Sequence, residues 1–490
     1  MPKDEAFSVL SQIVAQGLDY PEGASKNSQV KAALDALFDG RYHARSRPKD
    51  AFRDAYGLRD EGVPYAGVIA PENPNSGAYG GASLAWFPRD DGTLMTLVVG
   101  TKGLAPDEGL LTRHGHRRRV AALRNYLAKR GVSAWSKADP AAISTRMPDS
   151  ARRRFPSCEA VFNRYGDVIY SAAWIPKGEL AKADQVLRAY FDLYGRERNW
   201  VVRASAQSEA EEFFGALQEY LFPAVTAADV ASLLRERRFV VLQGPPGTGK
   251  TRMADQVRRD FFGSHGRTVQ FHPAVTYEDF VVGLSPDPSD AGLRFRAKPG
   301  WLLQAAADAS DAPYLLIVDE INRGDLGKVL GEAIYLFEPG EVGGSQAREV
   351  SLTHAIDGRA TFRLPTNLYV LGTMNTADRS IAGLDLAVRR RFAFVTLMPD
   401  PRVVTLPAAR EVFDKLMDVF VEHASDEMLH LLPGHSYFMA QDEGHLQDRF
   451  RYDLLPLVDE YLRQGLLGGA GSDLHAVREQ IADFVGGQEA

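Results

Sequence analysis

A glycine-rich segment at residues 244–251 constrains the fold of this chain more than any other feature. The segment reads Gly244, Pro245, Pro246, Gly247, Thr248, Gly249, Lys250 and Thr251. It matches the pattern G-x4-G-K-[ST], and it lies between the apolar run Phe239 to Gln243 and a helix-compatible segment. Glycines let backbone N–H groups wrap a polyphosphate, and the helix that follows adds the positive end of its dipole. The pattern therefore predicts a strand, a phosphate-binding loop and a helix, in that order.

Two residues of this loop have side chains suited to phosphoryl transfer. A lysine at the position of Lys250 can reach the β- and γ-phosphates, and the hydroxyl of Thr251 can ligate Mg2+. The alternative is a chance glycine-rich turn, but the flanking strand and helix patterns both fit the phosphate loop.

A second apolar run ends in two carboxylates. Leu315-Leu-Ile-Val is followed by Asp319 and Glu320. At the carboxyl edge of a parallel sheet, this order places Asp319 beside the Mg2+ and Glu320 where it can polarise an attacking water.

A third strand end and an arginine run complete the pattern. Asn375 comes just after the predicted strand at 368–373. At this strand end, its neutral amide could form a hydrogen bond with the attacking water or with the γ-phosphate. Further on, Leu384 to Phe392 contains three consecutive arginines at positions 389–391. An arginine delivered to the transferring phosphate, often by a neighbouring subunit, is worth about 10³ to 10⁵ in rate. The alternative is a solvated helix end favoured by the helix dipole.

Strand and helix signals alternate after residue 208. We predict strands at 239–243, 268–272, 314–319 and 368–373, with helices at 209–221, 227–237, 411–423 and 450–462. Continuous apolar strands separated by helices imply a parallel sheet that is buried on both faces. The fold class is therefore α/β, with an N-terminal α+β domain (1–205), an α/β core (206–400) and a C-terminal helical lid (401–490).

Residues 1–205 show mixed α and β patterns. Helical spacing occurs at 27–37, 117–129 and 178–194, and β-prone runs at 83–87 and 94–99 flank a turn-rich insert, which favours a hairpin. Residues 71–81 are rich in Pro, Gly, Asn and Ser and predict a loop, either a plain connector or a binding loop.

Composition limits the setting in which such a chain works. Lys and Arg number 57 and Asp and Glu 64, so the net charge is 57 − 64 = −7, which argues against a purely electrostatic binder of nucleic acid. Cys158 is the single cysteine, so the chain forms neither an internal disulfide nor a Cys-based zinc cluster. No apolar run approaches the ~20 residues of a membrane span, and the N-terminus lacks a signal-peptide pattern. We expect a cytoplasmic protein without membrane contact.

The four motifs together resemble the AAA+ superfamily, and more narrowly the McrB-like NTPases of modification-dependent restriction systems. The strings are GPPGTGKT, LLIVDEINR, GTMNTADRS and LAVRRRF, with MNTADRS the most specific. Residues 271–283 and the lid segment 434–438 (GHSYF) agree with this family. The resemblance covers about residues 210–465.

The resemblance implies a role for each matching residue. Lys250 and Thr251 would bind phosphate and Mg2+, Asp319 would coordinate Mg2+, and Glu320 would be the catalytic base. Asn375 would sense the γ-phosphate.

Arginines and the lid complete the implied site. Arg323 and either Arg390 or Arg391 would face a nucleotide across a subunit boundary. Many relatives carry a Gly-x-Arg sensor in the lid, but this chain has Gly434-His435-Ser436, so His435 or Ser436 is the candidate substitute.

The family also implies partners and a substrate. AAA+ subunits assemble as hexameric rings, and McrB-like proteins work with a separately encoded McrC nuclease; this sequence shows no nuclease motif of its own. The nucleotide is GTP or ATP, because no string decides between them. Tyr277 or Phe280 would either face the channel of the ring or pack onto the sheet edge.

The N-terminal domain occupies the place of a DNA-recognition domain. Basic clusters at 113–119 and 152–154 are candidates for phosphate contacts, with solvated surface as the alternative. Tyr79, Trp86 and Trp135 are candidates for stacking on an extruded base, with a place in the core as the alternative.

Two principal functions fit this pattern. The first is an NTP-driven ring motor in a restriction or antiphage defence system. The second is a protein-remodelling chaperone of the MoxR or dynein-related type that reads no DNA. A scaffold that binds nucleotide without hydrolysis is less consistent with Glu320 and Asn375.

Overall fold

The computed structural model divides the chain into two compact units. It describes residues 5–19, 26–46, 52–54, 63–70, 72–73, 78–286, 294–343, 347–377 and 386–486. The first unit comprises Met1–Phe222 with Val421–His423, and the second Pro223–Phe420 with Ala424–Ala490. The predicted boundary after residue 205 falls inside a helix, so the first unit extends to the end of that helix.

An antiparallel sheet forms the centre of the first unit. In the described residues its strands are β1 (Phe52–Asp54), β2 (Ala66–Val68), β3 (Ala82–Arg89), β4 (Gly92–Val99), β5 (Ala134–Ser136) and β6 (Ile169–Pro176), in the order β1-β2-β3-β4-β6-β5. The predicted hairpin is confirmed as β3 and β4. Its turn is shorter than predicted, because Arg89 pairs with Gly92 and leaves Asp90 and Asp91 as the turn.

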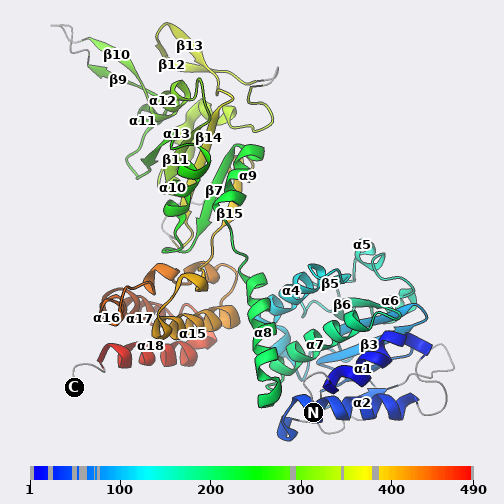
Figure 1. The fold of residues 1–490 in the computed structure, drawn as a ribbon. Coiled ribbons are helices and arrows are strands. Elements are labelled where there is room, and N and C mark those ends of the chain that lie inside the picture. The colour runs from blue at the N-terminus through cyan, green and yellow to red at the C-terminus, as the bar shows by residue number, and fades with distance from the viewer. Residues whose placement is uncertain are drawn as a thin grey trace. The chain divides into compact units, whose positions relative to one another are not determined.

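Helices cover this sheet. They are α1 (Glu5–Gln16), α2 (Lys26–Arg41), α3 (Glu108–Leu111), α4 (His114–Ala128), α5 (Asp149–Arg152), α6 (Glu159–Tyr165), α7 (Leu180–Glu197) and α8 (Ala204–Leu221). Figure 1 shows α1 and α7 beside the sheet, and their buried Phe7 and Leu187 share one core with Trp86 of β3. Helix α8 packs on α4 through the edge contact of Phe213 with Tyr126, which explains why α8 belongs to this unit. Of the predicted loop at 71–81, residues 71 and 74–77 lie outside the described residues.

A parallel sheet forms the centre of the second unit. Its described strands are β7 (Phe239–Gly244), β8 (Gly266–Gln270), β11 (Tyr314–Asp319), β14 (Leu368–Asn375) and β15 (Ala393–Thr396), in the order β15-β7-β14-β11-β8. All four pairings are parallel, as the continuous apolar runs predict. Phe239 and Val241 of β7 face one core while Val240 and Leu242 face another, so both faces of the sheet are buried.

Short helices and two hairpins surround this sheet. They are α9 (Ala227–Arg237), α10 (Lys250–Phe261), α11 (Tyr277–Phe280), α12 (Trp301–Asp308), α13 (Leu326–Leu330) and α14 (Leu386–Arg389), with the hairpins β9 (Val282–Pro286) with β10 (Phe295–Pro299) and β12 (Val350–Ile356) with β13 (Arg359–Phe362). Helices α9 and α10 contribute to the core that contains Val240. Helices α12 and α13 contribute to the core that contains Val241.

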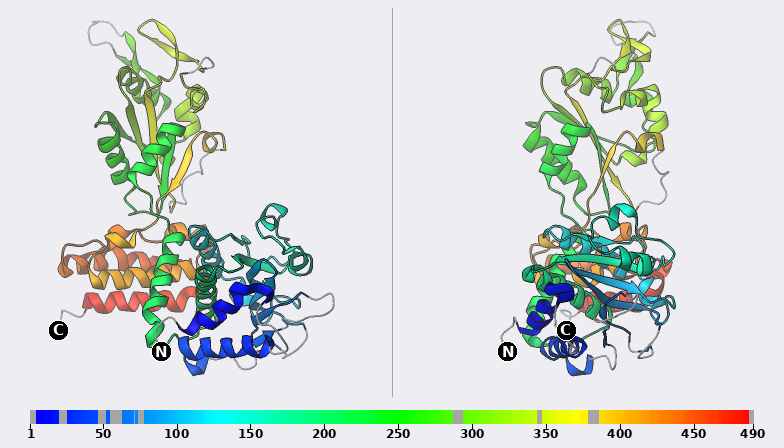
Figure 2. Two further views of the ribbon diagram at one scale, coloured as in Figure 1. Left: turned by 45° about the vertical axis from the view of Figure 1, so that its right-hand side comes forward. Right: turned by 90° about the vertical axis from the view of Figure 1, so that its right-hand side faces the viewer.

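The C-terminal part of the second unit is helical, as predicted. Its helices are α15 (Pro407–His423), α16 (Glu443–Arg449), α17 (Leu455–Gln464) and α18 (Gly471–Gly486), and one π-helical turn (Phe450–Leu454) joins α16 to α17. Figure 2 shows these lid helices at the opposite end of the core from the two hairpins. No helix in the described part of the chain is long and apolar enough to cross a membrane.

Candidate active site

The loop after β7 carries its bends on glycines. Gly247 and Gly249 adopt φ angles of 78° and 77°, values that glycine tolerates and other residues rarely adopt. Gly249 is the N-cap residue of α10, so the loop leads directly into the positive end of this helix. The local sequence therefore forms a cradle of backbone N–H groups at the carboxyl end of a central strand.

Lys250 is buried beneath this loop. Its side chain is 6% exposed, and Nζ donates to the carbonyl oxygens of Gly244 at 3.1 Å and Pro245 at 2.7 Å. Burial lowers the pKa of Lys250 to about 8, and the nearby carboxylates of Glu320 and Asp319 offset only part of that effect. The ammonium group is thus held where an added polyanion would stabilise its charged form.

Three oxygen-bearing side chains meet at the ends of β11 and β14. The Thr251 hydroxyl donates to Asp319 Oδ1 at 2.9 Å, and the Thr373 hydroxyl donates to the same oxygen at 2.5 Å. A hydroxyl and a carboxylate are hard oxygen ligands, which Mg2+ prefers. Thr251 and Asp319 therefore supply oxygen atoms that would fit a magnesium ion.

Glu320 and Asn375 lie against each other just beyond this cluster, one residue after Asp319 and two after Thr373. Asn375 Nδ2 donates to Glu320 Oε1 at 2.5 Å. Glu320 adopts φ 54°, the left-handed region, and its N–H donates to the Thr373 hydroxyl at 3.2 Å. A strained backbone at a polar strand end is typical of functional sites. The left-handed turn places Glu320 beside the amide of Asn375.

The predicted arginines fall into different environments. Arg323 is 45% exposed, with Nε 3.4 Å from Glu320 Oε2 of its own chain. Arg391 is 2% exposed, 3.2 Å from Glu338, and it donates to the carbonyl oxygen of Ala387. The Arg390 side chain is 65% exposed and 3.6 Å from Glu338. Arg391 is therefore held inside its own chain, whereas Arg390 is accessible from outside.

The lid touches the phosphate loop through its backbone. The N–H groups of Gly434 and Ser436 donate to the carbonyl oxygens of Pro246 and Gly247 at 3.0 and 3.1 Å. His435 lies between these two contacts. Sequence reasoning singled out residues 434–436 by position but missed these bonds, because backbone groups leave no signal in residue identity.

Tyr277 and Phe280, the candidates for facing the channel of a ring, both make contacts within their own chain. Phe280 is 2% exposed and packs edge-on against Phe271. Tyr277 is half-buried, and its hydroxyl donates to Glu332 at 2.5 Å. Phe280 packs beside the end of the edge strand β8, as the sheet-edge interpretation predicts, whereas Tyr277 contacts Glu332 outside the sheet.

The N-terminal candidates also divide by burial. Trp86 is fully buried, so its ring cannot stack on a base. Arg119, in the basic cluster at 113–119, is 4% exposed and lies 2.7 Å from Glu197. Its side chain is therefore not available on the surface for a phosphate contact. Arg153 and Arg154 are exposed. They remain available on the surface of the unit.

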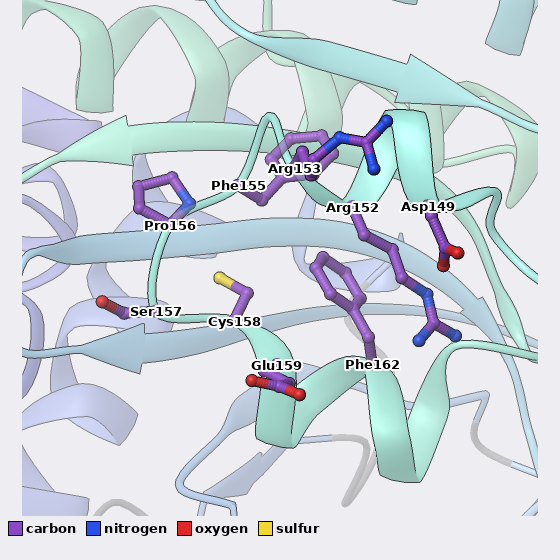
Figure 3. Close-up of a pocket in the computed structure, with 9 residues that line it drawn as sticks. All are labelled: Asp149, Arg152, Arg153, Phe155, Pro156, Ser157, Cys158, Glu159 and Phe162. Carbon is purple, nitrogen blue, oxygen red and sulfur yellow. The ribbon is translucent and has the colours of Figure 1, made fainter.

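Arg153 also lines a cavity of about 480 Å³ beside α5 and α6. The residues around it are Asp149, Arg152, Arg153, Phe155, Pro156, Ser157, Cys158, Glu159 and Phe162 (Figure 3). Phe155, Cys158 and Phe162 are buried and make its apolar floor. The guanidinium groups of Arg152 and Arg153 point in different directions in Figure 3. Burial raises the pKa of the Cys158 thiol to about 12, so the thiol is unreactive at neutral pH.

Comparison with known proteins places the site in a family context. Residues 239–392, from β7 to the residue after the arginine run, match the AAA domain of the dynein-related subfamily. This range contains the phosphate loop, both carboxylates, Asn375 and all the predicted arginines.

Two bacterial restriction proteins are similar over longer stretches. The EcoKMcrB subunit of the type IV methyl-directed restriction enzyme of Escherichia coli strain K12 is 29% identical over 357 residues, which cover 65% of this chain and 76% of that subunit. The YdiS component of the type II restriction enzyme BsuMI of Bacillus subtilis strain 168 is 27% identical over 189 residues, which cover 31% of this chain and 55% of that component.

Proposed function

We propose that this chain, a McrB-like AAA+ protein, hydrolyses a nucleoside triphosphate, GTP or ATP, in a Mg2+-dependent reaction as the motor subunit of a restriction or antiphage defence system. The observation that supports this most directly is the arrangement at three neighbouring strand ends. Thr251 bonds Asp319, and Asn375 bonds Glu320, beside the buried amine of Lys250. The similarity to two restriction proteins supports the biological setting.

Each side chain has a distinct task in the proposed reaction. Lys250 and the loop N–H groups would bind the β- and γ-phosphates, and Thr251 and Asp319 would hold Mg2+, which would neutralise charge on the phosphate oxygens. Glu320 accepts a proton from the attacking water while Asn375 fixes the position of its carboxylate. A general base of this kind contributes about 10² to 10⁴ in rate.

We propose that the active unit is a hexameric ring in which Arg390 reaches the neighbouring nucleotide. The exposed side chain of Arg390 supports this, because Arg391 is buried and also donates to the carbonyl oxygen of Ala387 of its own chain. Arg323 lies close enough to Glu320 to hold the base in place until a neighbouring nucleotide competes for the guanidinium.

We also propose that the ring works with a separate McrC-like nuclease and that the first unit contacts DNA. The support for DNA contact is local: Arg153 and Arg154 are exposed next to the cavity beside α5 and α6. Guanidinium groups that contact phosphates release counterions, so this binding should weaken steeply with salt.

Phosphate release with Mg2+ and either GTP or ATP tests the proposed hydrolysis. The wild-type protein should turn over at least one of the two nucleotides, and competition between them identifies the preferred base. Lys250→Ala should abolish turnover, because the loop loses the cation that reaches the β- and γ-phosphates. Lys129→Ala, which removes an exposed lysine of the first unit, is the matched control. Turnover that persists in Lys250→Ala would rule out this site as the catalytic one.

DNA binding distinguishes the restriction motor from a remodelling chaperone. We expect the wild-type protein to bind duplex DNA, with methylated and unmethylated duplexes compared by anisotropy. In the double variant Arg153→Ala and Arg154→Ala, the slope of log K against the logarithm of the salt concentration should become shallower. The change should correspond to the loss of about two phosphate contacts. Arg130→Ala, which removes a surface arginine stacked on Tyr126, is the control. Absence of DNA binding in the wild type would favour the chaperone.

A further inference from the structure

One carboxylate oxygen lies among three arginines that come from two segments of the chain. Glu338 Oε1 lies 3.2 Å from a guanidinium nitrogen of Arg391 and 3.6 Å from one of Arg390. The same oxygen lies 3.8 Å from Arg348. The Glu338 side chain is 24% exposed, so it is largely shielded from water. The arginine run therefore has a counter-charge within its own chain.

Packing in the core fixes the position of this carboxylate. Phe337 comes directly before Glu338 and is 1% exposed. Its ring stacks on that of Phe392, which directly follows Arg391, with the two centroids 5.6 Å apart. Both rings also contact Phe239 of β7, at 4.8 and 5.9 Å. The segments that carry the carboxylate and the arginines are thus held against each other and against the central sheet.

Glu338 is available to Arg390 because the other two arginines have further partners. Arg348 forms two hydrogen bonds with Glu341, one of them at 3.1 Å. Arg391 donates to a backbone carbonyl oxygen of its own chain at 2.8 Å. The Arg390 side chain is 65% exposed, and in the described part of the chain Glu338 is the carboxylate within 4 Å of it.

Arg389, the other exposed arginine of the described run, has a different neighbour. Its guanidinium carbon lies 5.6 Å from the centroid of the Phe394 ring in β15. Of these two exposed arginines, it is therefore Arg390 that Glu338 contacts.

We infer that Glu338 is a positioning residue that holds Arg390 ready for the nucleotide of the neighbouring subunit. The inference rests on the proposed function. An exposed arginine side chain has many rotamers, and an ion pair with a fixed carboxylate restricts them before the neighbour arrives. An ion pair as exposed as this one is weak, so a triphosphate, which carries more charge, can take the guanidinium from Glu338.

Glu338→Gln tests this role because it keeps the size of the side chain and removes its charge. A misplacement of about 1 Å can cost about 10²-fold in rate. Arg391 keeps its carbonyl contact in this variant, so we expect a smaller loss of kcat, about tenfold. KM should stay within about twofold of the wild-type value, because the arginine acts on charge that develops in the transition state.

A double-mutant cycle shows whether Glu338 acts through Arg390. In the Arg390→Ala background, Glu338→Gln should change kcat by less than about twofold. A purely structural role would lower kcat by the same factor in both backgrounds. Glu349→Gln, which removes the carboxylate from an ion pair with Arg363 at 3.1 Å, is the matched control and should leave kcat unchanged.

Glu338→Asp serves as the second variant if urea denaturation shows that Glu338→Gln does not fold. It keeps the charge beside Arg391, but its shorter side chain withdraws the oxygen from Arg390, so it should lose rate only where Arg390 is present. Wild-type kcat in a folded Glu338 variant, or equal losses in the two backgrounds, would overturn the inference and leave the proposed function in place. A wild-type protein without turnover would contradict the proposed function and the role of Glu338 with it.

Discussion

At the candidate site, the buried amine of Lys250 is in an unfavourable environment that a bound triphosphate would improve. Lys250 is desolvated and bonded only to neutral partners, the backbone oxygens of Gly244 and Pro245 and, at 3.5 Å, the Thr248 hydroxyl. Glu320 accepts from Asn375 at the same end of the sheet. A polyanion between these groups supplies the counter-charge that Lys250 lacks and leaves the carboxylate to act on water. A bound nucleotide would therefore offset the part of the burial cost of Lys250 that the carboxylates of Glu320 and Asp319 leave uncompensated.

Nucleotide binding should take up a proton at alkaline pH. The pKa of Lys250 is lowered to about 8 in the free protein, so the amine loses its charge above that pH. A bound triphosphate raises this pKa again, and affinity should fall by about tenfold per pH unit above pH 8, the limit for one linked proton. Calorimetry at pH 7 and pH 9 in buffers of different ionisation enthalpy measures the uptake. Lys250→Gln has no proton to gain, and an unchanged pH dependence in that variant would contradict the assignment.

Neighbouring arginines should differ in their effect on stability. Arg391 is buried and bonded to Glu338 and to the carbonyl oxygen of Ala387, so Arg391→Ala leaves a partly buried carboxylate without this partner. We expect a loss of about 3 kcal/mol in the free energy of unfolding, measured by urea denaturation. Arg390→Ala removes an exposed side chain and should change stability by less than about 0.5 kcal/mol. Equal losses of unfolding free energy in the two variants would show that the difference in burial between Arg390 and Arg391 does not matter for stability.

At the scale of elements, the lid and the phosphate loop are joined by backbone bonds that require glycine at both contact points. Gly434 has an ordinary φ of −66°, so an alanine there meets no conformational strain of its own. The obstacle is the overlap of its β-carbon with the loop at Gly247. A methyl group at residue 434 therefore separates the two elements without altering any polar group of the site.

Gly434→Ala should uncouple the lid from hydrolysis. We expect at least about a tenfold loss of kcat/KM, because the lid loses its contact with residues 246 and 247 of the phosphate loop, and faster amide exchange at residues 434–436. Gly469→Ala is the matched control, because a β-carbon there meets nothing within 4 Å. Normal hydrolysis in Gly434→Ala would show that the contact between lid and loop is dispensable.

The sequence predicts four of the five described strands of the core sheet, without β15, and it predicts the meeting of the polar strand ends. The reason for the second is that the sheet is parallel. Strands that run in one direction end at one edge, so Asp319 and Asn375 come together although the chain between them is long. Other features depend on the third dimension. Glu338 gives no sign in the sequence that it binds Arg391, and the bonds from Gly434 use N–H groups that nearly every residue has. The ends of β8 were also misplaced, at 268–272 instead of Gly266–Gln270, because Phe271 fills the core beyond the strand.

At the scale of the whole molecule, the proposed ring requires that one chain completes the site of the next. The described residues supply Lys250, Asp319 and Glu320 within one site, and they place Arg391 against Glu338 of its own chain. Exposed arginines of the described run are Arg389 and Arg390, and the side chain of Arg390 is 65% exposed. A neighbouring subunit would complete such a site by adding a further cation for the developing phosphate charge.

Mixing two inactive variants tests this arrangement. Arg390→Ala keeps its own loop and base but supplies no arginine, whereas Glu320→Gln supplies the arginine but has no base. Each alone should lose at least about 10² in hydrolysis. In a ring of head-to-tail contacts, random mixing at equal amounts places an intact site next to an intact arginine at about a quarter of the boundaries, so about a quarter of the wild-type rate should return.

The control is a mixture of Arg390→Ala with a variant that carries both substitutions. That mixture forms the same rings but contains no arginine at position 390, so it should stay inactive. If the mixture with Glu320→Gln also stays inactive while both proteins assemble together, Arg390 acts within its own chain. Recovery in the first mixture alone requires that the arginine of one subunit works at the base of its neighbour, because no single chain in that mixture carries both groups.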